Sequence, residues 1–257
     1  MLQLLYLSCS VMTEKIVYPV DNINLASRTG ISAKTPFSET MCESIDTHQY
    51  KSLLDIGCGS GIIGIYSLLN QMPFVYFNDI QPNCIQLTKY NLQQQSIPKN
   101  KYEFIEGSFE SIDLSKYSID LITFNPPQLS TDWVSMNIFK EDSEKIFRNG
   151  GKTGKKVINN FFQWFSKQPT NKITIQLGIS SLLKIDSFLE TTEKEFNLSG
   201  IKKYMKKVPL RKFLYPMVKK MSEREQNERE IAIIDNVFYK NIHILQFKNK
   251  SQAKLNE

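Results

Sequence analysis

Apolar runs alternate with amphipathic stretches along the central part of the chain. Four short runs rich in Leu, Ile, Val, Phe and Tyr have the length of buried strands, and they begin near residues 52, 74, 102 and 119. Residues 62–69 and 80–95 lie between them and carry apolar side chains at helical spacing. Strict alternation of strand and helix predicts an α/β fold with a doubly wound parallel sheet, whose ligand binds at the carboxyl ends of the strands.

A glycine-rich turn, residues 57–61, follows the first run. Glycines let the backbone turn tightly and approach a ligand closely at a helix start. The G-x-G-x-G spacing differs from the G-x-G-x-x-G of dinucleotide sites, and no lysine follows that would bind phosphate. Asp55 precedes the turn and favours a ligand with an ammonium group, as S-adenosylmethionine has. Asp79 ends the second run, where a carboxylate accepts from both ribose hydroxyls.

The segment Asn125-Pro126-Pro127-Gln128 follows the fourth run. Two consecutive prolines end a strand, because each fixes φ and lacks an N–H for the ladder. The loop therefore offers carbonyl acceptors, and the Asn125 side chain adds another. Such a corner is suited to hold an NH₂ group by its hydrogens, which leaves the nitrogen lone pair free to attack.

These segments together resemble the class I S-adenosylmethionine-dependent methyltransferases of the N-P-P branch, which includes release-factor glutamine methyltransferases and small-domain RNA methyltransferases. The matching segments are L-L-D-I-G-C-G-S-G at 53–61, N-D-I-Q-P-N-C-I-Q-L-T-K-Y-N at 78–91, F-I-E-G-S-F at 104–109, N-P-P-Q at 125–128 and F-R-N-G-G-K-T-G-K-K-V-I at 147–158. The resemblance implies a Rossmann-like, doubly wound sheet of seven strands, mostly parallel, with a C-terminal antiparallel hairpin expected at 201–208 and 239–247.

The resemblance also implies S-adenosyl-L-methionine as cofactor and a role for each matching residue. Cofactor contacts are expected from Asp55, Gly57, Gly59, Gly61, Asp79, Ser108, Phe109 and Asn125. The catalytic loop is expected to comprise Asn125, Pro126 and Pro127. Gln128 stands where the family usually has an aromatic ring that packs on the acceptor, so substrate contacts are expected from Phe37, Gln128 and Trp133.

Two parts are expected along the chain. Residues 1–45 form an N-terminal segment that flanks the cofactor and acceptor cleft, in which Ser38 is the expected N-cap of a helix. Residues 46–257 form the methyltransferase domain. The hairpin strands are too far apart for a tight loop, so an insertion at about 209–236 is expected, with helices near 213–218 and 228–236, as a lid or acceptor-recognition element.

Composition and charge refine this picture in a few places. The net charge is +6, and eight Lys or Arg residues without an acid lie between Lys202 and Lys220. That stretch is either a phosphate-contacting face or a solvated surface. Cysteines without C-x-x-C spacing and two isolated histidines predict reduced thiols, a cytoplasmic protein and no metal. No run reaches transmembrane length, so no membrane partner is expected.

The acceptor stays open at this point. Gln128 and the short segment before the first strand favour a small-molecule or amino-acid-like acceptor with an amine or amide nitrogen. The alternative is an RNA or protein (glutamine) N-methyltransferase. A non-catalytic methyltransferase-like subunit that binds a partner is a third reading, and an oxidoreductase with a Rossmann cofactor is a fourth.

Overall fold

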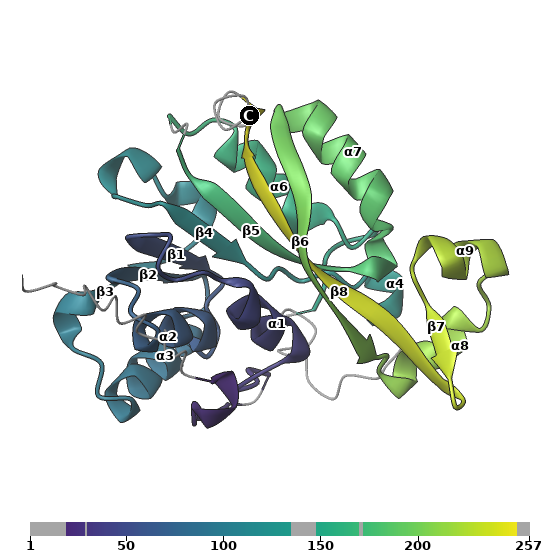
Figure 1. Cartoon of the computed structure of the whole chain (residues 1–257), viewed down its shortest axis with the longest axis horizontal. Coiled ribbons are helices and arrows are strands. Elements are labelled where there is room, and N and C mark those ends of the chain that lie inside the picture. The colour runs from purple at the N-terminus through teal and green to yellow at the C-terminus, as the bar shows by residue number, and fades with distance from the viewer. Residues whose placement is uncertain (1–18, 29, 135–147, 170–171, 251–257) are drawn as a thin grey trace, which may run out of the picture.

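The computed structural model describes residues 19–28, 30–134, 148–169 and 172–250. Within them, one twisted sheet runs through the middle of the protein with helices on both faces (Figure 1). The strand order is β3-β2-β1-β4-β5-β8-β6, with a short β7 beside β8. The strands are β1 (Ser52–Ile56), β2 (Phe74–Asp79), β3 (Tyr102–Glu106), β4 (Leu121–Phe124), β5 (Thr174–Ser180), β6 (Leu198–Pro209), β7 (Ala232–Ile234) and β8 (Val237–Asn249).

Strands β1 to β5 are parallel to one another, whereas β8 pairs antiparallel with both β5 and β6. The predicted doubly wound sheet and its C-terminal hairpin are therefore confirmed. The hairpin strands are longer than predicted, and β7 adds an eighth strand to the expected seven. The α-helices are α1 (Pro36–Ser44), α2 (Ile62–Leu69), α3 (Pro82–Gln94), α4 (Thr131–Val134), α6 (Lys156–Phe165), α7 (Ile185–Phe196), α8 (Tyr215–Val218) and α9 (Glu223–Glu228).

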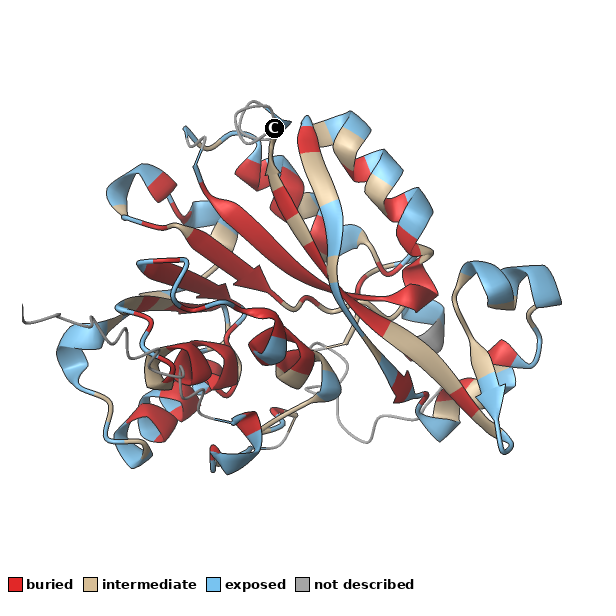
Figure 2. Ribbon diagram, in the orientation of Figure 1, coloured by how far each residue is buried: buried red, intermediate tan, exposed pale blue. Residues whose placement is uncertain are grey.

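Two apolar layers cover the sheet (Figure 2). The helices α1, α2 and α3 lie on one face, and α6 and α7 lie on the other. Every residue of β1, β4 and β5 is buried, which is why these strands are rich in apolar residues on both faces. Gly64 lets α2 approach the sheet closely, because a Cβ there would lie 2.2 Å from the Phe77 ring. This packing holds the loops after β1, β2 and β4 together at the carboxyl ends of the parallel strands.

The chain between β6 and β8 differs from the prediction in one element. Residues 213–218 do contain α8, but the helix predicted at 228–236 is wrong, because Ala232–Ile234 forms β7 against β8. Asp235 and Asn236 have φ values of 49° and 62°, which is the backbone of a two-residue hairpin turn. A small apolar cluster holds this region together: Leu182, Leu210, Leu214, Val218 and Phe238.

Candidate active site

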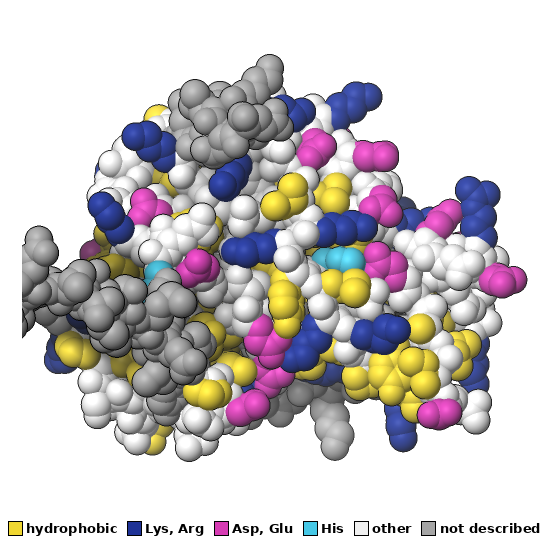
Figure 3. Space-filling model, viewed as in Figure 1, with side chains coloured by type: hydrophobic (Ala, Val, Ile, Leu, Met, Phe, Trp, Pro, Cys, Tyr) yellow, Lys and Arg dark blue, Asp and Glu magenta, His cyan; other side chains and the backbone are white. Residues whose placement is uncertain are grey.

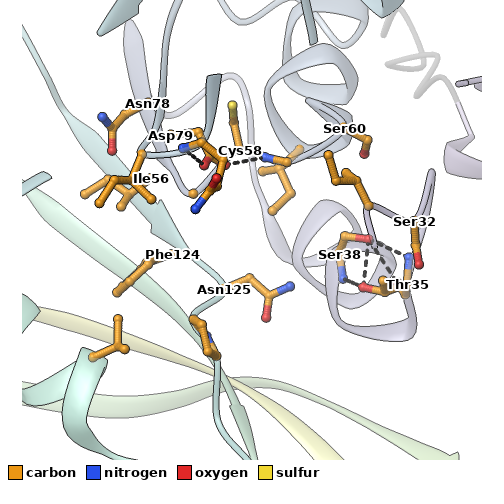
Figure 4. A pocket seen from close by; sticks show the side chains of 18 of the residues that line it. Ser32, Thr35, Ser38, Ile56, Cys58, Ser60, Asn78, Asp79, Phe124 and Asn125 are labelled. Atoms are coloured by element: carbon orange, nitrogen blue, oxygen red, sulfur yellow. Dashed lines mark hydrogen bonds between the residues drawn. The ribbon is translucent and has the colours of Figure 1, made fainter. Parts of the chain in front are cut away.

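A cleft of about 420 Å³ opens at the carboxyl ends of β1, β2 and β4 (Figure 4). Its volume lies in the range of small-molecule sites. Its lining comes from the loops after these strands and from the segment before α1. The residues that line it are Gly30, Ile31, Ser32, Thr35, Ser38, Ile56, Gly57, Cys58, Gly59, Ser60, Ile62, Ile63, Asn78, Asp79, Ile80, Gln81, Gly107, Ser108, Phe109, Phe124, Asn125, Pro127, Arg148, Asn149, Val157 and Arg211.

The glycine-rich turn forms one wall of this cleft. Gly57, Gly59 and Gly61 have φ values of 64°, 58° and 83°, a backbone that side chains with a Cβ rarely adopt. A Cβ on Gly61 would also lie 2.6 Å from the Thr88 side chain. Gly61 ends the turn as the N-cap of α2. The three glycines are therefore required by the turn itself. Gly57 and Gly59 line the cleft, whereas Gly61 is absent from its lining.

Asp79 lies at the end of β2 and faces the same cavity. Its two carboxylate oxygens accept hydrogen bonds from Gly59 N at 3.0 Å and Gln81 N at 2.9 Å. Burial raises the pKa of the carboxyl, and these two N–H groups counteract part of that rise. Each carboxylate oxygen has a further acceptor position, which leaves Asp79 able to accept from a diol in the cleft.

Asp55 has a different environment from the one that the sequence suggested. Its side chain is buried under the glycine turn and is absent from the cleft lining. Thr123 Oγ1 donates to Asp55 Oδ1 at 3.0 Å, while Oδ2 has no hydrogen-bond partner among the described residues. Burial raises the pKa of this carboxyl to about 7. Contact between Asp55 and the ammonium of a cofactor therefore stays a prediction.

The opposite wall of the cleft is apolar. Phe109 lies edge-on to the ring of Phe124, with ring centroids 5.6 Å apart, and it also packs against Trp164. Ser108 lines the cleft and accepts from Glu110 N at 3.3 Å. Ile80 lines the cleft although 63% of its surface is exposed. The sequence analysis missed Ile80; the signal was an apolar residue directly after the carboxylate that ends a strand.

The loop after β4 supplies the predicted acceptor corner. Figure 4 shows the Asn125 side chain pointing from the end of β4 into the space in front of α1. Its amide makes no hydrogen bond that involves the other described residues. Pro127 lines the cleft, whereas Pro126 is buried behind it. The loop thus presents one side-chain amide, held by two prolines, to the cavity.

Gln128 points away from this cavity. Its amide nitrogen donates to Gly178 O at 2.6 Å, and its amide oxygen accepts from Ser180 N at 2.7 Å. Both bonds tie the loop to β5, and Gln128 is absent from the cleft lining. A structural role accounts for this glutamine, which the sequence analysis had expected to contact the acceptor.

The segment after residue 147 closes over the same loop. Leu129 N donates to Arg148 O at 2.9 Å, and Gly150 N donates to Leu129 O at 2.7 Å. A Cβ on Gly154 would lie 2.4 Å from Gln128 O, so this glycine permits the close approach of the two segments. Arg148 and Asn149 consequently line the cleft, as does the distant Arg211. Sequence reasoning assigned none of these three to the site.

The segment before β1 forms the remaining wall. Thr35 is the N-cap of α1, and Ser38 takes part in a capping box with it, so the prediction of Ser38 as N-cap was wrong by three residues. Phe37 is half-buried and lies behind the lining residues, near Asn125. The side chain of Trp133 lies outside the described residues, and its predicted contact with the acceptor stays a prediction.

The fold and this site define a class I methyltransferase domain that uses S-adenosylmethionine. The model of the family "Methyltransferase small domain" matches residues 27–167, more than half of the chain. The chain belongs to this family. The matched segment contains the glycine turn, Asp79, the Asn125 loop and the segment that closes over it.

Curated proteins resemble parts of the chain. A ribosomal RNA large subunit methyltransferase G from Colwellia psychrerythraea is 26% identical over 59% of this chain and 37% of its own length. A release factor glutamine methyltransferase from Clostridium botulinum is 33% identical over 37% of this chain and 34% of its own length. The chain thus spans little more than a third of either relative.

A solved structure from Pyrococcus horikoshii, provisionally described as an RNA methyltransferase, has a TM-score of 0.55. It is 13% identical, and the match covers 90% of this chain and 94% of that protein. This likeness concerns the fold. In the described part of the chain, no helix has the length and apolarity to cross a membrane. His, Cys, Asp and Glu side chains form no cluster of three or more suited to a metal within the same residues.

Proposed function

We propose that this protein transfers a methyl group from S-adenosylmethionine to a nitrogen atom of an RNA base. The observation that carries the proposal is the orientation of the Asn125 amide, which faces the cleft next to a wall suited to this cofactor. This amide makes no hydrogen bond that involves the other described residues. The rRNA methyltransferases among the relatives support the same acceptor class.

The lining of the cleft fits the cofactor. We assign the ribose hydroxyls to Asp79, whose oxygens keep acceptor positions beside the two backbone N–H groups. Adenine would lie between Ile80 and Phe109, because both offer apolar surface on the same wall. The backbone at Gly57 and Gly59 would border the methionine part. When bound, S-adenosylmethionine supplies a sulfonium methyl group that is already a strong electrophile.

The protein then has to orient the acceptor and exclude water. Asn125 Oδ1 would accept one hydrogen of the acceptor NH₂. The second acceptor that we propose is the Pro126 carbonyl, on the backbone between the two lining residues Asn125 and Pro127. An exocyclic amine of a base is a poor nucleophile because its lone pair is delocalised into the ring. Two hydrogen-bond acceptors that hold its hydrogens favour a pyramidal nitrogen whose lone pair points at the sulfonium methyl group. No general base is required, because the proton can leave after transfer.

Gln128 no longer favours the small acceptor that the sequence suggested, and unpaired cations beside the cleft favour RNA. The hydrogen bonds of Gln128 to β5 account for that residue without reference to the acceptor. The basic stretch also divides into two parts. Lys202 pairs with Asp186 and Lys206 with Glu43, and Figure 3 has basic and acidic side chains side by side over β6.

One residue of the second part reaches the cleft. Arg211 lines it, and Lys212, Lys219 and Lys220 follow on the exposed surface. None of these four has a carboxylate within ion-pair distance among the described residues. Unpaired cations beside a cleft favour a polyanionic partner such as RNA. We further propose the division into a flanking segment, residues 1–45, and a methyltransferase domain, 46–257, with the insertion at about 209–236 as an acceptor-recognition element.

Incorporation of a labelled methyl group tests the acceptor class. The protein is incubated with tritiated S-adenosylmethionine and the RNA, protein and metabolite fractions of a lysate, each with and without ribonuclease. We expect label in the RNA fraction that ribonuclease releases as methylated nucleotides. Label confined to the protein fraction would favour a glutamine-type acceptor, and label confined to metabolites would return a small molecule to first place.

A further inference from the structure

Two neighbouring cations, one in the cleft lining and one behind it, have no role in the chemistry described above. Arg211 follows the end of β6 and lines the cleft. Lys240 lies on β8 and pairs in register with Val208, three residues before Arg211. Lys240 Nζ donates to Ser180 Oγ at 3.0 Å and lies 4.7 Å from the centre of the Phe37 ring.

This pair of cations lacks a neutralising acid. No carboxylate of a described residue lies within ion-pair distance of Arg211 or Lys240, whereas Lys202, Lys206 and Lys184 each have such a partner. Burial and the neighbouring guanidinium lower the pKa of Lys240 to about 7. Two like charges at a partly buried site destabilise each other unless an anion binds between them. Such an arrangement is more typical of a ligand site than of a solvated surface.

The cations lie next to the acceptor corner. A Cβ built on Gly178 would lie 3.6 Å from both Asn125 Oδ1 and Phe37 Cδ1, so both side chains lie next to Gly178. The Lys240 ammonium in turn lies over the ring of Phe37. Asn125 and Arg211 line one cleft. A molecule held by Asn125 would therefore reach Arg211 within the same cleft, while Lys240 lies behind the lining residues, beside Phe37.

We propose that Arg211 and Lys240 form an anion subsite that binds a backbone phosphate of the nucleotide whose base is held by Asn125. This inference rests on the proposed RNA acceptor and deepens it. A base that enters the cleft leaves its own phosphate at the rim. The planar guanidinium of Arg211 suits two phosphate oxygens, and the Lys240 ammonium adds a point charge from behind the lining. The pair would thereby select a nucleotide unit over an uncharged amine.

Binding of inorganic phosphate and of a short single-stranded RNA to the protein saturated with S-adenosylhomocysteine tests the subsite directly. The variants are Arg211→Gln and Lys240→Met. Lys99→Gln is the matched control, since it removes one exposed positive charge near β3, at the opposite edge of the sheet. We expect each subsite variant to weaken both ligands at least 10-fold in titration calorimetry, and Lys99→Gln to leave both unchanged. Arg211 is exposed, so its variant keeps the test valid if Lys240→Met unfolds.

Two further measurements separate the alternatives. If the cations held the carboxylate of the cofactor instead, both variants would weaken S-adenosylmethionine and leave RNA binding to the saturated protein unchanged, which would overturn the proposal. The absence of phosphate binding to the unmodified protein would also overturn it. Phosphate binding without methyl incorporation into RNA would reject the RNA acceptor while keeping the anion site, so the failures of the two proposals are distinguishable.

Discussion

Replacement of Asp79 by alanine tests the cofactor wall. In the structure, each carboxylate oxygen accepts a backbone N–H, and the carboxylate lines the cleft. The variant loses its hydrogen bonds with the ribose, and we expect a total loss of about 1.5–3 kcal/mol, the scale of a hydrogen bond to a charged group. We expect the dissociation constant of S-adenosylmethionine to rise roughly 10- to 150-fold. S-adenosylhomocysteine should weaken by the same factor, because its ribose is identical.

The asparagine variant sharpens this test. Both oxygens of Asp79 accept from backbone N–H groups, so either orientation of the introduced amide sets its NH₂ against a backbone donor. Asp79→Asn should therefore bind the cofactor no better than Asp79→Ala. Glu106→Ala is the control, since Glu106 pairs in register with Asp79 but lies outside the cleft lining. Calorimetry that finds unaltered cofactor affinity in Asp79→Ala would refute the assignment of the ribose to β2.

Three further variants test other parts of the account. Gly154→Ala should lower the melting temperature and the methylation rate together, because its Cβ would clash with Gln128 O at 2.4 Å and its φ is 77°. Gly178→Ala should fold normally, because its Cβ would meet its neighbours at 3.5 Å or more, yet raise the KM for the acceptor by crowding the Asn125 side chain. Asp55 has a raised pKa of about 7 when folded, so the folded state binds more protons than the unfolded state between about pH 4 and 7. In denaturant unfolding, the free energy of unfolding of the wild type should fall across that window as pH rises, by about 1.4 kcal/mol per unit of pKa shift. The free energy of unfolding of Asp55→Asn should fall less over the same window.

Much of the fold and part of the site were predictable from the sequence, because their signals are local. The turn at Gly57, Gly59 and Gly61 and the loop at Asn125 are contiguous motifs, and each directly follows a buried run. The strands β1, β4 and β5 have apolar patterns that match their burial on both faces. Such features require no knowledge of distant contacts.

Other features depend on contacts that the linear pattern does not contain. Arg148 and Arg211 reach the cleft only because distant segments fold over the Asn125 loop. The role of Gln128 depends on β5, about fifty residues away. Residues 228–236 read as a helix because Ile231, Ile234 and neighbouring charges fit that spacing. The turn at Asp235 and pairing with β8 make Ala232–Ile234 a strand instead.

The central claim is that Asn125 holds the acceptor nitrogen and contributes little to cofactor affinity. Single-turnover methylation by Asn125→Ala, measured beside S-adenosylmethionine affinity in calorimetry, tests it most directly. We predict a rate about 100-fold lower, the scale of losing one preorganised polar contact, with cofactor affinity unchanged. A rate close to that of the wild type, or a loss of cofactor affinity as large as the loss of rate, would contradict the account.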